Sequence, residues 1–212
     1  MIEPSYREKL QSAMLSIATR ILEAEGLEGL QARRIAREAG CSVGTLYNIF
    51  ASLDDLILAA NAHTLEDLGR ALIVARDASA HASLEDRLQA LALAYLRFAV
   101  VHQKSWRAVF EHHMTSGQPV PAWYREAQAK QFGLVEEVLR DLMPEPIVRA
   151  RAARALFSAV HGIVALALDR KLGEFDLAET EAQVRFVMAA ASKGLASAHV
   201  GEETEVIQDG GG

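Results

Sequence analysis

The sequence predicts an all-α protein. Residues 5–118 contain no proline, so nothing in that stretch removes a backbone N–H from a helix. Apolar residues recur at steps of three and four, and no sustained alternation of β-branched and polar residues is found. Half of the 212 residues are hydrophobic and 24% are charged, which is typical of a globular protein with ample core.

The first predicted helix covers residues 5–25 and ends at Gly26, a residue that adopts left-handed backbone easily. Its apolar stripe, at steps of four, three and four, consists of Leu10, Met14, Ile17 and Ile21. Two short helices follow, at residues 31–39 and 43–50, separated by Gly40. Ser42 is the expected N-cap of the second short helix.

Longer helices are expected after residue 52, where Ser52 provides the next N-cap. They are placed at residues 53–78, 83–104, 105–115, 121–142, 146–171 and 176–198. The acidic, glycine-rich residues 200–212 are expected to be disordered. The sequence therefore divides into a first domain at 1–52, a second at 53–199 and a tail at 200–212.

The segment QARRIAREAGCSVGTLYNIF, residues 31–50, carries the most specific pattern in the chain. Two short helices joined by a tight glycine-containing turn are the outline of a helix-turn-helix, whose second helix enters the major groove of DNA. Three arginines and one glutamate give this segment a positive charge, whereas the whole chain has a formal net charge of −6. Such a local asymmetry suits contact with phosphates.

The string GLEGLQARRIAREAGCSVGTLYNIFASLDDLI, residues 26–57, resembles the DNA-binding domain of the TetR family of tetracycline-repressor-like regulators. The matching positions are Ile35-Ala36, Ala39-Gly40, Ser42, Gly44-Thr45-Leu46-Tyr47 and Phe50. Three positions depart from the usual pattern: Gln31 replaces a capping Thr, Ile49 a His or Tyr, and Leu53 a Lys. The last two departures remove polar DNA contacts.

Chemistry suggests roles for the residues of this motif. Hydroxyl groups, arginines and the free N–H groups of a helix N-terminus bind phosphates, while Asn, Thr and Val can read base edges. A glycine allows close approach of the backbone to DNA. The predicted DNA-binding residues are Arg33, Arg34, Ser42, Val43, Gly44, Thr45, Tyr47 and Asn48. The alternative is a plain three-helix core in which Thr45 and Tyr47 only pack.

A second group of residues suggests a ligand pocket in the second domain. Tyr95, Phe98, His102, Trp106, Phe110 and His113 share one helical face, with a bend expected near residue 105. Aromatic residues with a few polar groups are typical of small-molecule sites, although such a stripe can equally be plain core. Phe157, His161 and Gly162 resemble a TetR subgroup marked by a Trp-His-Gly motif, with Phe157 in place of the Trp. His161 is then a ligand-facing residue or a hydrogen-bonded core histidine.

Several classes of protein are disfavoured. One cysteine, Cys41, excludes a disulfide framework and a multi-cysteine metal site, and the histidines lack ligand spacing, so no metal and no cofactor is expected. No nucleophile elbow or P-loop supports an enzyme. No apolar run reaches the length of a membrane span and no signal peptide is recognisable, which predicts a cytoplasmic protein.

The resemblance implies a homodimer that binds a palindromic operator in double-stranded DNA and responds to a small apolar or amphipathic effector. Two predicted helices, at residues 146–171 and 176–198, are apolar on more than one face, which fits a dimer formed through a four-helix bundle. The leading hypothesis is a ligand-responsive regulator, most simply a repressor. The alternative is a helical dimeric adaptor without specific DNA binding.

Overall fold

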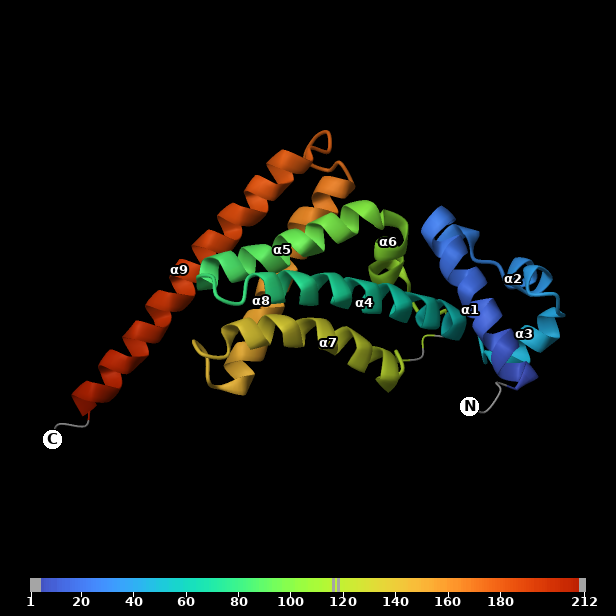
Figure 1. Cartoon of the computed structure of the whole chain (residues 1–212), viewed down its shortest axis with the longest axis horizontal. Helices are drawn as coiled ribbons and strands as arrows, with labels where there is room; N and C mark the ends of the chain where they lie inside the picture. Colours follow the sequence, from blue (N-terminus) through green and yellow to red (C-terminus); the bar gives the residue numbers. More distant parts are fainter. Residues whose placement is uncertain (1–4, 116, 118, 210–212) are drawn as a thin grey trace. The chain divides into compact units, whose positions relative to one another are not determined.

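The computed structural model describes residues 5–115, 117 and 119–209. These residues form nine α-helices and one short 3-10 helix, with no strand among them, so the all-α prediction is confirmed (Figure 1). The elements in chain order are α1 (Tyr6–Glu25), η1 (Leu27–Gly29), α2 (Ala32–Glu38), α3 (Val43–Ile49), α4 (Leu53–Ala78), α5 (Leu84–Val101), α6 (Gln103–Glu111), α7 (Ala122–Leu139), α8 (Pro146–Leu168) and α9 (Leu177–Asp209).

The chain packs into two compact units. The first comprises residues 1–68 and 101–128, and the second comprises residues 69–100 and 129–212. The first unit differs from the predicted domain at residues 1–52 because α6 and the start of α4 pack with the N-terminal helices. Ala108 of α6 belongs to the same apolar cluster as the buried residues of α1, α2 and α3.

The core of the first unit is built from the apolar faces of short helices that could not be stable alone. Met14 and Ile21 of α1, Ile35 of α2 and Leu46 of α3 are completely buried. Leu10 is also buried, whereas Ile17 is only partly buried and packs at the edge of this cluster. The three helices therefore hold one another in place and leave the opposite face of α3 to solvent.

Local capping explains where most helices begin. Ser52 Oγ accepts a hydrogen bond from the Asp55 N–H at 3.0 Å and donates one to the Asp55 carboxylate at 3.0 Å. Ser83 and Asp86 repeat this arrangement at the start of α5. Each pair satisfies an N–H group that has no acceptor within the helix and places a carboxylate at the positive end of the helix dipole.

Several predicted helix boundaries differ from the structure, and two of the differences bear on the predicted sites. The break in the aromatic stripe falls at His102, which is the N-cap of α6, and not near residue 105. Helix α9 continues to Asp209, beyond the predicted end at residue 198, because the glutamates of this stretch favour helix once one is started. The disorder expected for residues 200–212 stays a prediction, and residues 210–212 lie outside the described residues.

The second unit leaves much apolar surface exposed on α8 and α9. Phe186 is 74% exposed and Ile147 is 70% exposed, although both are large apolar side chains. Helix α8 is long and apolar enough to cross a membrane by length and composition, and 22% of its most apolar window is buried within the structure. An apolar helix whose exposed face packs against a partner chain has the same length, composition and low burial.

Candidate functional site

A hydrogen-bonded turn fixes the angle between α2 and α3. Gly40 has φ +70°, the left-handed conformation that glycine adopts without steric cost. The Cys41 N–H donates to the Ala36 carbonyl at 2.9 Å, and the Gly40 N–H donates to the Arg37 carbonyl at 3.2 Å. These two bonds form a Schellman motif, which satisfies carbonyl groups at the end of α2 and turns the chain directly into α3.

The start of α3 is capped as predicted. Ser42 Oγ accepts a hydrogen bond from the Thr45 N–H at 3.0 Å and lies 2.8 Å from Thr45 Oγ1. Gln31, in contrast, makes no side-chain cap for α2, in line with its departure from the family pattern. The hydroxyls of Ser42 and Thr45 therefore organise the first turn of α3, while the next N–H groups of that turn have no acceptor within the helix.

Most of the predicted DNA-binding residues on α3 and its N-cap are accessible to solvent. Ser42, Gly44, Tyr47 and Asn48 are exposed, and Val43 and Thr45 are partly exposed. Leu46 and Phe50 occupy the opposite face and are buried. Four of the eight predicted residues are thus exposed on α3 and its N-cap, whereas the side chain of Val43 packs against the core cluster.

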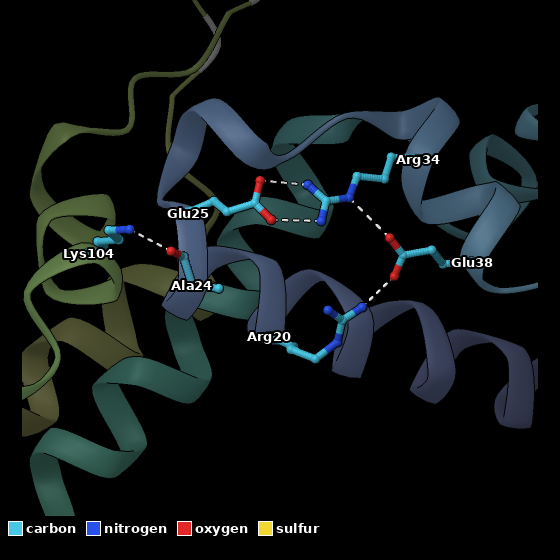
Figure 2. Close-up of polar contacts among 6 residues, drawn as sticks. All are labelled: Arg20, Ala24, Glu25, Arg34, Glu38 and Lys104. Atoms are coloured by element: carbon cyan, nitrogen blue, oxygen red, sulfur yellow. Dashed lines mark hydrogen bonds and ion pairs between the residues drawn. The ribbon is translucent and has the colours of Figure 1, made fainter.

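Arg34 has structural partners that the sequence did not indicate (Figure 2). Its two terminal nitrogens each donate to an oxygen of Glu25 at 2.7 Å, and its Nε donates to Glu38 at 3.0 Å. Arg20 of α1 pairs with the other oxygen of Glu38. The hydrogen bonds from Arg34 lower the pKa values of Glu25 and Glu38 and raise the pKa of Arg34 itself.

The two neighbouring arginines of α2 are therefore not equivalent. Arg33 is exposed and makes no ion pair with any residue that the structure describes, so its charge is available to a phosphate. Arg34 joins α2 to the end of α1 through a bidentate pair with Glu25. Its pairing with Glu38, at i and i+4, had a recognisable spacing in the sequence, but its pairing with Glu25 did not.

The end of α1 is also tied to α6. Lys104 Nζ donates a hydrogen bond to the carbonyl of Ala24, one residue before Glu25 (Figure 2). Carbonyl groups at the C-terminal end of a helix lack partners within the helix and attract cations. One end of α1 thus contacts both the helix-turn-helix, through Glu25, and α6, through Lys104.

The loop after α6 is held by Asp54, at the start of α4. The Asp54 carboxylate accepts hydrogen bonds from the Thr115 N–H and the Thr115 hydroxyl, each at 3.0 Å. His112 Nε2 lies 3.4 Å from Asp54 Oδ1, and burial lowers the pKa of this histidine. Because these contacts draw the chain toward Asp54, α6 ends at Glu111 and not at the predicted residue 115.

The predicted aromatic stripe is divided between the two units. Tyr95 and Phe98 belong to the second unit, whereas His102, Trp106, Phe110 and His113 belong to the first. His113 lies beyond the end of α6 and is exposed, so its place in a continuous helical face was predicted wrongly. Trp106 is buried and packs against Phe110, with ring centroids 5.4 Å apart.

Tyr95, Phe157 and His161 come together in the second unit. The Tyr95 hydroxyl lies 2.8 Å from His161 Nδ1, and the rings of Phe157 and His161 are stacked with centroids 5.5 Å apart. Phe132 of α7, which was not among the predicted residues, packs edge-on against Phe157 at 5.1 Å. Periodicity shows which residues share a face of one helix, but not which helices meet, so the contribution of α7 had no signal in the sequence.

Burial lowers the pKa of His161 below its ordinary value of 6.5, because the charged ring is poorly solvated there. In the unfolded chain the imidazole titrates normally and binds a proton first as the pH falls. Above pH 6.5 His161 is neutral in both states and does not change the free energy of unfolding. Below pH 6.5 the unfolded chain binds the proton more readily, so the free energy of unfolding falls.

We therefore expect the melting temperature to fall between pH 7 and pH 5, with a smaller fall in the His161→Gln variant. Thermal unfolding followed by circular dichroism at several pH values measures both slopes. His113→Gln is the matched control, because His113 is exposed. Equal slopes for wild type and His161→Gln would contradict this account of His161.

These features define a helical DNA-binding protein of the helix-turn-helix class with a separate helical domain. The family described as "Bacterial regulatory proteins, tetR family" matches residues 14–60, and "Tetracyclin repressor-like, C-terminal domain" matches residues 88–191. The chain belongs to the TetR family of transcriptional regulators. The resemblance to the Trp-His-Gly subgroup remains a prediction.

Known relatives agree with this assignment. The HTH-type transcriptional regulator Rv1816 of Mycobacterium tuberculosis and its counterpart Mb1846 of Mycobacterium bovis are each 28% identical over 118 residues, or 56% of this chain. The matched segment spans about half of those relatives, 48% of their length.

Solved structures share the fold. A protein with unknown function from Rhodococcus sp. RHA1 is 25% identical with a TM-score of 0.71, and covers 92% of this chain and 100% of its own. The multidrug binding protein EbrR, complexed with imidazole, is 23% identical with a TM-score of 0.61, covering 89% and 96%. A TetR-like transcriptional regulator from Rhodococcus sp. RHA1 is 22% identical with a TM-score of 0.57, covering 92% and 99%.

Proposed function

We propose that this chain is a cytoplasmic repressor that binds a palindromic operator as a homodimer and releases it when a small effector binds. The exposed face of α3 on a rigid turn is the observation that carries the proposal. In this role Asn48, Val43 and Thr45 read base edges, while Arg33, Tyr47 and the first turn of α3 contact phosphates. Gly44 allows the backbone to approach the DNA.

Arg34 has a different role in this proposal from the one expected for it. Its guanidinium binds Glu25 and Glu38 and is committed to the contact between α1 and α2. Arg34 is therefore a positioning residue that sets the place of α2, and of these two adjacent arginines Arg33 supplies the phosphate contact.

The proposed dimer forms through α8 and α9, where large apolar side chains are exposed. TetR-family regulators typically dimerise, and burial of Phe186, Ile147, Leu166 and Leu177 in a four-helix bundle removes their apolar surface from water. Two copies of α3 then contact two half-sites, so the dimer recognises more base pairs than one short recognition helix can.

Phe186→Asp is expected to shift the protein from dimer to monomer, because it places a charge in the proposed apolar interface. Light scattering during size-exclusion chromatography measures this shift. Val101→Asp is the control, since Val101 is 75% exposed but lies outside α8 and α9. A dimer that persists unchanged in Phe186→Asp would place the interface elsewhere.

The proposed effector site includes Tyr95, Phe132, Phe157 and His161. Aromatic rings surround a hydrogen-bonding pair in this cluster, an arrangement that suits an apolar or amphipathic molecule with one polar group. Helix α4 begins next to the helix-turn-helix at Leu53 and ends at Ala78 in the second unit, so it is the proposed two-state element. Effector and DNA then weaken each other's binding by equal amounts, typically about 1–3 kcal/mol.

Fluorescence anisotropy with labelled DNA from beside the protein's own gene tests the proposal. Binding that resists excess random competitor, with two protomers per site, is the expected result. Compounds that release the DNA identify effectors, and Tyr95→Phe should weaken that release without changing DNA affinity in their absence. A protein whose DNA affinity is unchanged by every compound that binds it is not a ligand-responsive repressor.

A further inference from the structure

A groove of about 880 Å³ lies within the first unit, between the end of the recognition helix and the loop that follows α6. We refer to it as the α3–α6 groove. It is lined by Leu27, Leu30, Tyr47, Ala51, Ser52, Leu53, Asp54, Asp55, Ile57, His112, His113, Met114 and Thr115. None of these residues belongs to the Tyr95–His161 cluster, so this groove is separate from the proposed effector site.

The lining combines an apolar surface with an acidic end. Leu30, Ile57 and Met114 contribute apolar side chains, and Tyr47 contributes an aromatic ring that is 46% exposed. Asp54 and Asp55 contribute two carboxylates, while no lysine or arginine occurs among these described lining residues. The charge complementary to this lining is therefore positive.

His112 provides a second, independent indication of a ligand. Its side chain is only 8% exposed, and its Nε2 makes no hydrogen bond to any atom that the structure describes. Asp54 Oδ1 is 3.4 Å away, beyond a good hydrogen-bond distance. Buried polar nitrogens normally have partners, and a hydrogen-bonding group of a molecule in the groove would supply the one that is missing here.

We propose that the α3–α6 groove binds an amphipathic organic cation. The positive group lies near Asp55 and Asp54, and the apolar body packs on Ile57, Met114 and the ring of Tyr47. A molecule in this position covers Tyr47, which the proposed function assigns to DNA contact, so it competes with DNA. Only this competition rests on the proposed function; binding of the cation itself does not.

Two probes of the same shape and opposite charge test the site. Isothermal titration of the full-length protein with tetraphenylphosphonium is expected to show binding, whereas tetraphenylborate is expected to show none. Asp55→Asn should weaken the cation about fivefold, as expected for loss of one partly exposed charge. Asp86→Asn is a matched control because Asp86 makes the same capping contacts with Ser83 far along the chain.

The place of binding is read from methionine methyl groups by NMR. The protein has five methionines, and Met114 lines the groove whereas Met188 is buried in the second unit. Tetraphenylphosphonium should shift the Met114 signal, assigned with Met114→Leu, and leave the Met188 signal in place. The proposal is overturned by equal binding of both probes, by Asp55→Asn binding as wild type, or by an unmoved Met114 signal. A cation that binds at Met114 without releasing DNA would leave the site intact and contradict only the proposed DNA contact of Tyr47.

Discussion

Replacing Gly44 by alanine is expected to stabilise the protein while weakening its binding to DNA. A Cβ atom added at Gly44 meets only Ser42 Oγ, at 3.7 Å, which is ordinary van der Waals contact, and its φ angle is not in the left-handed region. Gly→Ala at such a position typically stabilises a protein by about 0.4–1 kcal/mol. The fold therefore does not require this glycine, and we assign it to close approach of the backbone to DNA.

The added methyl group of Gly44→Ala is expected to lower operator affinity on the order of tenfold, equivalent to about 1.4 kcal/mol. Chemical denaturation and fluorescence anisotropy measure the two effects on the same protein. Gly133→Ala in α7 is the control, because nothing lies within 4 Å of a Cβ at Gly133 and it is far along the chain from α3. If Gly44→Ala binds DNA as tightly as wild type, α3 does not approach DNA through its first turn.

Arg33→Gln is expected to change DNA binding and Arg34→Gln the stability of the fold, although the two residues are adjacent. Loss of the Arg33 charge should reduce the slope of log affinity against log salt by about 0.9 per protomer, because one phosphate contact is lost. Arg34→Gln should lower the melting temperature, because Glu25 loses its bidentate partner and Glu38 keeps only Arg20. Its salt slope should stay close to that of the wild type.

Glu25→Gln separates the two roles further. It removes the bidentate partner of Arg34 without changing any cation of α2, so it should lower the melting temperature and leave the salt slope unchanged. Combining it with Arg34→Gln should cost less stability than the sum of the single changes, since both break the same contact. A reduced salt slope in Arg34→Gln would instead indicate that Arg34 contacts a DNA phosphate.

The helix-turn-helix could be predicted from sequence because its determinants are local. Gly40 at the turn, Ser42 at the N-cap of α3 and the apolar spacing of Ile35 and Leu46 all act within about 12 residues of one another. The end of α6 was missed because it depends on Asp54 and Thr115, which are 61 residues apart. No local pattern marks such a bond.

The same distinction applies to the sites. The exposed face of α3 follows from the period of one helix, and Gly44, Tyr47 and Asn48 are exposed there, whereas Val43 packs against the core. Arg34 was assigned to DNA because a lone sequence shows its charge but not the carboxylate of Glu25, nine residues away, that binds it. Tyr95 and His161 are 66 residues apart in sequence, so their hydrogen bond could be identified only from the folded structure.

Selection of binding sites from a pool of random double-stranded DNA shows whether the protein reads a DNA sequence, because it requires no knowledge of the operator. We expect enrichment of an inverted repeat whose half-sites are separated by about one helical turn or a multiple of it, with loss of enrichment in Asn48→Ala. A purified, folded dimer that enriches no sequence above the starting pool would show that this protein is not a sequence-specific DNA-binding regulator.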